Sequence, residues 1–326
     1  MARHIRRGLV LGGGGTLGAA WMIGALCALE EERGFDPRTA DMIVGTSAGS
    51  ILSALLGAGA GARELWRHQH GEAVESGPLA GRIFDYDNAA GGAAPPFPQP
   101  GIGSPKLIAR SVRHPRRYPG TAVLSAFLPG GRGSLGAIGR MVEDVIPSGA
   151  WSPHPGIRIV AMDYDNGERV VFGEPGAPST GLAEAVVASC SIPGWFPPTV
   201  IGERRFVDGG TFSNTSLDLF SPGRLPGGLP YDEVYVLAPM AAREYDKPTS
   251  MMGRLERGYR HRVTRGMLLE ARQVRAGGSR VIVLCPGPDD LEALGANMMD
   301  PTRRPDVLAT ARRTTAGYLS GTGLAA

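Results

Sequence analysis

A G-x-S-x-G string, Gly45-Thr46-Ser47-Ala48-Gly49, places one serine between two glycines. The segment Asp41-Met-Ile-Val44, with three apolar residues, precedes the string and an Ala- and Leu-rich stretch follows it, which predicts a strand, a sharp turn and a helix. A serine on such a turn exposes its hydroxyl above the edge of a sheet, and Gly45 and Gly49 permit the strained backbone and close packing that the turn needs. We therefore predict that Ser47 is a nucleophile, with an ordinary N-capping serine as the alternative.

Four consecutive glycines, residues 12–15, follow the short apolar run 8–11. Successive backbone N–H groups in such a loop can hold the oxyanion of an acyl-transfer transition state. Residues 13–18 also satisfy G-x-G-x-x-G, the fingerprint of a dinucleotide-binding loop. That fold needs an acidic residue at the end of its second strand, where this chain has Val44 and Gly45. An oxyanion hole is therefore the better interpretation, and NAD binding is the alternative.

A serine nucleophile also needs a base, and Asp208 stands at the end of Arg205-Phe-Val207 and before Gly209 and Gly210. Its ordinary pKa of about 3.9 makes it a weak base, but burial beside the serine would raise that pKa. A surface aspartate in a turn is the alternative interpretation. Of the six histidines, His261 alone follows Asp208 in the order of a Ser-Asp-His triad, and it sits in the middle of a predicted helix among arginines, which disfavours a triad.

The elements that position these residues alternate along the chain as strand, glycine loop, helix, strand, sharp turn and helix. This alternation predicts a three-layer α/β fold, with a mostly parallel central sheet, helices on both faces and the site at the carboxyl ends of the strands. Further elements are predicted at a hairpin over residues 157–172, a helix over 180–188, a helix over 251–276, and buried strands over 233–238 and 280–285.

The composition of the 326 residues is that of a soluble globular protein, with 42% hydrophobic and 20% charged residues. A net charge of only +3 gives no reason to expect nucleic-acid binding. The three cysteines lie far apart among apolar neighbours, which predicts buried thiols. Residues 8–29 carry no charge, but their glycines break the continuous helix of a leader or membrane anchor, so we expect a cytoplasmic protein.

The glycine loop, the G-x-S-x-G string, residues 188–198 (Ala-Ser-Cys-Ser-Ile-Pro-Gly-Trp-Phe-Pro-Pro) and the Asp-Gly-Gly string occur in an order that resembles the patatin-like phospholipase family, over residues 6–219. The resemblance implies a serine hydrolase of lipid acyl esters that needs no metal, cofactor or histidine. Ser47 is then the nucleophile and Asp208 the base. The resemblance also implies that the backbone amides around Gly13, Gly14 and Gly15 form the oxyanion hole. The glycines that support the motifs are then Gly18, Gly45, Gly49, Gly209 and Gly210.

Two positions depart from the family pattern. Leu17 stands where members usually carry Arg or Lys, and Asn214-Thr215-Ser216 lacks the usual proline after the asparagine. These departures keep open the alternative of a weakly active or silent lipid-binding protein. We expect residues 6–220 to form the catalytic core and residues 221–326 to complete the same domain.

Three further segments bear on how a lipid would reach the site. Residues 88–105, crowded with Gly, Ala and Pro, predict an irregular loop that is either a linker or a lid. Two Arg-rich segments, residues 110–117 and the predicted helix 251–276, suggest peripheral membrane contact. In that helix Leu255, Tyr259, Val263 and Met267 recur every four residues, and a surface helix that packs this apolar stripe on the core is the interpretation that we favour.

Overall fold

The centre of the molecule is an eight-stranded sheet, in a computed structural model that describes residues 4–89, 91–92, 94, 96–224, 229–248 and 250–321. The strands run in the order β5-β6-β3-β2-β1-β7-β8, and β4 pairs with β3 beside that path. Five neighbouring strands are parallel: β3 (Ile157–Asp163), β2 (Met42–Thr46), β1 (Arg7–Leu11), β7 (Glu233–Leu237) and β8 (Arg280–Leu284). The other three pair antiparallel at one edge: β4 (Arg169–Phe172), β5 (Thr199–Ile201) and β6 (Arg204–Asp208).

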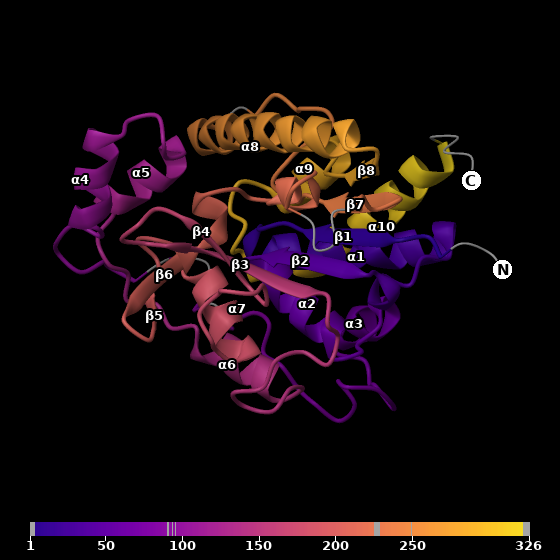
Figure 1. Cartoon of the computed structure of the whole chain (residues 1–326). Helices are drawn as coiled ribbons and strands as arrows, with labels where there is room; N and C mark the ends of the chain where they lie inside the picture. Colours follow the sequence, from indigo (N-terminus) through magenta and orange to yellow (C-terminus); the bar gives the residue numbers. More distant parts are fainter. Residues whose placement is uncertain are drawn as a thin grey trace.

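Helices cover both faces of the sheet because successive strand residues point to opposite sides and both sets are apolar. Leu9 and Leu11 pack with one group of helices and Val10 with the other. The first group is α1 (Gly15–Arg33), α2 (Ala48–Gly57), α3 (Ala62–Gln69), α6 (Gly136–Glu143), α7 (Leu182–Cys190), α9 (Pro288–Leu294) and α10 (Arg304–Gly321). The opposite face is covered by α8 (Met251–Ala276), which lies above the sheet in Figure 1. The predicted three-layer, mostly parallel α/β fold is confirmed.

Two further helices, α4 (Pro105–Arg113) and α5 (Gly120–Phe127), form a separate lobe with a small core of their own. That core includes Met162 of β3 and Val207 of β6, so the lobe is anchored to the edge of the sheet beside Asp208. Figure 1 shows the lobe next to one end of α8. Short 3-10 helices span Pro37–Thr39, Gly209–Thr211, Leu217–Phe220 and Pro301–Arg303.

The uncharged residues 8–29 form β1, the glycine loop and most of α1, and they lie in the main core. Trp21 of α1 is almost completely buried, and α1 packs along α10. Among the helices of the described residues, none is long and apolar enough to cross a membrane. The three cysteines are buried free thiols, as predicted.

The predicted hairpin is confirmed, since β3 and β4 pair antiparallel around a turn in which Gly167 has a φ of 68°. The helix over 251–276 has its predicted bounds.

The described part of residues 88–105 contains no helix or strand before α4 begins, and residues 90, 93 and 95 lie outside the described residues. Because β7 and β8 extend the sheet that β1 begins, we propose that residues 221–326 complete the domain of residues 6–220.

Candidate active site

Ser47 occupies the sharp turn between β2 and α2 in a backbone conformation that few residues other than glycine adopt. Its φ is 53° and its ψ −123°, and Ser216 is the only other non-glycine residue of the described chain with a positive φ. Such a conformation costs on the order of 1–3 kcal/mol and persists only where the surroundings hold it. Two serines do so. The N–H of Ser47 donates to Ser189 Oγ at 2.8 Å, and its carbonyl accepts from the N–H and the hydroxyl of Ser50.

The glycines of the turn are required by close packing. A Cβ on Gly49 would lie 1.9 Å from the carbonyl oxygen of Leu11, and a Cβ on Gly45 would lie 2.4 Å from Ser53 Oγ. The Ser47 hydroxyl makes no capping hydrogen bond to α2, so the N-cap interpretation is wrong. The turn therefore presents a serine whose hydroxyl is free for chemistry, at the amino terminus of a helix that favours negative charge.

Asp208 ends β6, and its side chain is buried beside that turn. Its N–H donates to the carbonyl of Ser191 at 2.9 Å, and its Oδ1 accepts from the N–H of Gly210 at 2.7 Å. Burial raises the pKa of Asp208 to about 6, while the nearby Ser47 hydroxyl and the hydrogen bond from the Gly210 N–H favour the carboxylate and oppose this effect. An aspartate this buried is not the exposed turn residue of the alternative interpretation. Gly209 follows it directly against the carbonyl of Val160.

The segment over residues 188–198 connects the serine to the aspartate. Ser189, near the end of α7, holds the Ser47 N–H and donates its own hydroxyl to the carbonyl of Val160 in β3 at 2.6 Å. Two residues later, the carbonyl of Ser191 holds Asp208. The sequence marked this segment as part of a family pattern, but nothing in it indicated which atoms these serines bind.

The glycine loop lies next to Ser47, and its first residues are hydrogen-bonded to residues far along the chain. The Gly12 N–H donates to the carbonyl of Leu237 at 2.9 Å, and the Gly13 N–H donates to the carbonyl of Asn214 at 3.1 Å. The N–H groups of Gly14 and Gly15 donate to no acceptor among the residues that the structure describes. Both glycines line the same cleft as Ser47. Gly18, one turn into α1, packs against Pro239.

Leu17 is completely buried in the main core, and its N–H donates to the carbonyl of Met298 at 3.0 Å. A positive charge lies near the glycine loop nevertheless, and it comes from α8 instead of position 17. The fully buried Arg260 of α8 donates hydrogen bonds to the carbonyl of Pro239 and to the sulfur of Met298. Pro239 and Met298 are among the residues that pack against the glycine loop. The sequence placed Arg260 in an arginine-rich helix and gave no indication of this role.

The two alternatives considered for these motifs find no support in the geometry. The second strand, β2, ends at Thr46 and offers no acidic side chain to hold the ribose of a dinucleotide, and Met298 and Met299 pack beside Gly15. None of the six histidines lines the cleft that contains Ser47 and Asp208. His261 instead stacks on Tyr245, with ring centroids 3.7 Å apart.

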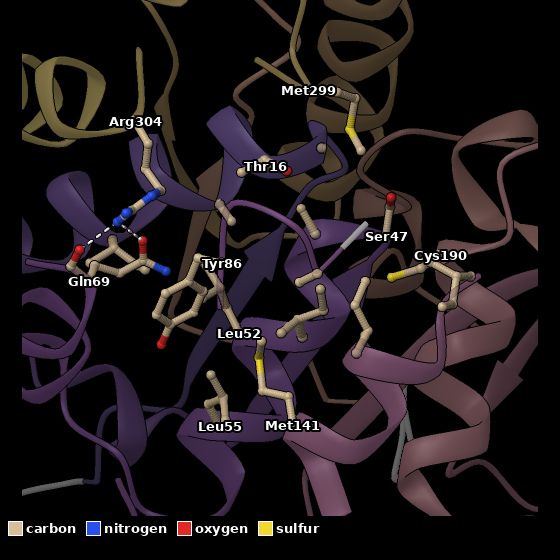
Figure 2. Close-up of a pocket in the computed structure, with 18 of the residues that line it drawn as sticks. Thr16, Ser47, Leu52, Leu55, Gln69, Tyr86, Met141, Cys190, Met299 and Arg304 are labelled. Atoms are coloured by element: carbon tan, nitrogen blue, oxygen red, sulfur yellow. Dashed lines mark hydrogen bonds between the residues drawn. The ribbon is translucent and has the colours of Figure 1, made fainter. Parts of the chain in front are cut away.

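Two cavities of different character meet at Ser47. An open cleft of about 860 Å³ contains Asp208 and the glycine loop and is bounded by α5 and α8. A narrow cavity of about 70 Å³ extends from Ser47 into the core between α1, α2 and α6 (Figure 2). Its lining is largely apolar and includes Ile51, Leu52, Leu55, Ile138, Met141 and Phe196. Arg304 lines it as well, but its guanidinium is engaged with Gln69 and Asp87.

A family model described as patatin-like phospholipase matches residues 9–221, a range that contains the glycine loop, Ser47 and Asp208. Among solved structures, VipD from Legionella pneumophila is similar with a TM-score of 0.49 at 13% identity, over 98% of this chain and 67% of that chain. The type III effector protein ExoU is similar with a TM-score of 0.37 at 17% identity, over 99% of this chain and 54% of that chain. A comparison with curated proteins gave no match.

Proposed function

The chain belongs to the patatin-like phospholipase family of lipid ester hydrolases, and we propose that it cleaves carboxylic esters through a Ser47–Asp208 dyad. One observation carries this proposal. A serine held in a strained turn lies beside a buried carboxylate whose pKa is raised to about 6, at the point where an open cleft meets an apolar cavity. A carboxylate with that pKa is ionised at neutral pH and is a stronger base than an exposed aspartate.

In the first half of the reaction, Ser47 Oγ attacks the ester carbonyl carbon while its proton moves to the Asp208 carboxylate. The carbonyl oxygen becomes an oxyanion, which we assign to the N–H groups of Gly14 and Gly15 because the Gly13 N–H is already bonded to Asn214. When the tetrahedral intermediate collapses, the bond to the alcohol oxygen breaks. Asp208 returns its proton to that oxygen, and the alcohol leaves through the open cleft.

In the second half, a water molecule attacks the acyl-enzyme and gives its proton to Asp208. The same N–H groups hold the second oxyanion. Collapse breaks the bond between the acyl carbon and Ser47 Oγ, Asp208 returns the proton to that oxygen, and the carboxylic acid is released. Both halves use one carboxylate as base and then as acid.

The narrow cavity gives the acyl chain its place, because it is apolar and begins at Ser47. An engineered cavity of roughly 150 Å³ binds benzene, so about 70 Å³ holds a chain of only about three or four carbons without rearrangement. Methionines line the cavity and can change conformation to admit longer chains. We therefore propose a preference for short acyl chains. Since lipid esters are presented by membranes, we also propose peripheral membrane contact.

The test is hydrolysis of a soluble short-chain ester and of a phospholipid in mixed micelles. Ser47→Ala and Asp208→Asn should each lower kcat by at least about 10³-fold with little change in KM. Ser53→Ala is the matched control, because Ser53 is also buried in α2 and its hydroxyl, among the described residues, bonds only to the carbonyl of Gly49. Equal turnover by the wild-type protein and Ser47→Ala would show that Ser47 is not the nucleophile. The alternative of a lipid-binding protein would then be favoured.

A further inference from the structure

The two acidic residues of α8 both point away from solvent. The Glu256 carboxylate pairs with Arg257 and Arg260, and its side chain is 9% exposed. The Glu270 carboxylate accepts hydrogen bonds from Ser213, Thr215 and the N–H of Leu217. Since these are the only carboxylates in the 26 residues of the helix, its outer face carries no negative charge.

That outer face combines arginines with large apolar side chains. Arg262, Arg265 and Arg272 are exposed and pair with no carboxylate among the described residues. Leu269, between Arg265 and Arg272, and Leu255, two turns before Arg262 on the same side of the helix, are 52% and 62% exposed. We call this surface the α8 outer face.

The apolar stripe expected for this helix divides between two environments. Met267 packs into the core beneath the sheet-facing side of α8, and Val263 packs partly against it. Leu255 and Tyr259 instead line the open cleft. Packing on the core therefore does not account for the exposed leucines.

The α8 outer face continues directly into the mouth of the cleft that holds Ser47. Arg254, Leu255 and Arg262 of α8 line one side of that mouth, and Leu124 and Leu128 of the α5 lobe line the other. Leu124 is 65% exposed, so apolar side chains project from both sides of the opening. Figure 1 shows α5 beside one end of α8.

We propose that the α8 outer face, together with the exposed leucines of α5, docks on the surface of an anionic lipid bilayer. Arginines attract anionic headgroups, and the leucines between them can enter the boundary between headgroups and acyl chains. The position of the cleft favours a bilayer over an acidic protein, because docking on this face brings Ser47 to the side from which a lipid would enter. The inference rests on the proposed function, because docking would serve to deliver lipids to Ser47. The binding of the protein to a bilayer does not itself require catalysis.

The binding test uses Ser47→Ala, which leaves lipids intact, with vesicles of phosphatidylcholine alone or with 30% phosphatidylglycerol in a sedimentation assay. We expect strong binding to the anionic vesicles, weakened by salt, and little binding to phosphatidylcholine. Adding Arg265→Gln and Arg272→Gln should reduce affinity for anionic vesicles roughly 25-fold, about 5-fold for each arginine. Adding Leu269→Ser should reduce the part of the vesicle binding that high salt does not abolish, because that part comes from apolar contact.

The matched control is Arg132→Gln with Arg140→Gln, two exposed arginines on or next to α6, on the other side of the sheet. This pair removes the same charge and should leave vesicle binding unchanged. Equal loss in both pairs would show a net-charge effect and overturn the proposal. So would unchanged binding after Arg265→Gln and Arg272→Gln, or binding to polyglutamate without binding to vesicles.

A soluble short-chain ester separates this inference from the proposed function. In a chain that retains Ser47, Arg265→Gln and Arg272→Gln should leave kcat/KM for that ester unchanged and lower the rate on anionic vesicles. If the wild-type protein does not hydrolyse the soluble ester, the proposed function is wrong. The docking proposal is then still decided by the vesicle-binding assay alone.

Discussion

The hydroxyl of Ser189 accepts a hydrogen bond from the N–H of Ser47 at 2.8 Å and donates one to the carbonyl of Val160 at 2.6 Å. The strained turn is thereby fixed to β3 at the centre of the sheet, through a side chain 142 residues away from it in sequence. A nucleophile held in this way needs no reorganisation at the moment of attack, which is what efficient acyl transfer requires.

Ser189→Ala should therefore lower kcat more than it raises KM. Removing the Ser189 hydroxyl leaves the buried N–H of Ser47 without a hydrogen-bond acceptor, which lowers the free energy of unfolding by about 1–3 kcal/mol. A displaced nucleophile should reduce kcat roughly 10- to 100-fold. Steady-state kinetics with a soluble ester, together with thermal unfolding, checks both effects. If stability falls while kcat is unchanged, Ser189 supports the fold and does not position Ser47.

The pH dependence of the reaction should follow the ionisation of Asp208. Burial raises its pKa to about 6, and only the carboxylate form can accept the Ser47 proton. We expect kcat/KM to fall about tenfold per pH unit below about 6 and to level off above it. A profile of hydrolysis between pH 4.5 and 8.5 measures this. A plateau that continues to pH 4.5 would mean that Asp208 is not the base.

Replacing Asp208 should stabilise the fold as it removes activity. A carboxyl whose native pKa is raised binds its proton more tightly in the folded state, so stability is greatest below the unfolded pKa of 3.8 and declines as pH rises through about 6. The shift corresponds to about 3 kcal/mol at neutral pH. Asp208→Asn should therefore unfold at a higher temperature than wild type at pH 7.5, with the difference disappearing near pH 4. A less stable variant at pH 7.5 would contradict this.

Much of the site could be predicted from sequence because its residues lie in short local patterns. The elbow serine, the glycine loop and the Asp-Gly-Gly string each combine a strand end with glycines, and the alternation of strands and helices indicated that they share one edge of the sheet. Ser189 and Arg260 could not be found in this way, because their roles are contacts between residues far apart in sequence. The helices α3, α4, α5, α9 and α10 were missed, and length does not explain this, because the nine-residue α7 was predicted while the 18-residue α10, whose apolar periodicity is weak, was not.

Acyl-chain preference should depend on Met141, which lies away from Ser47 on the far side of the narrow cavity in Figure 2. Met141→Ala removes three heavy atoms, so the preferred chain should lengthen by about two or three carbons. Relative kcat/KM on esters of two to twelve carbons measures the shift. Met141→Leu conserves volume and is the control, expected to keep the wild-type preference. If Met141→Ala folds and keeps that preference too, the acyl chain does not occupy this cavity.

The most direct test of the dyad is covalent labelling with a fluorophosphonate, read by mass spectrometry of the digested protein. The account predicts one adduct, on the peptide that contains Ser47, absent in Ser47→Ala and formed much more slowly in Asp208→Asn. An adduct that persists in Ser47→Ala, or that forms on another residue of the wild-type protein, would contradict it.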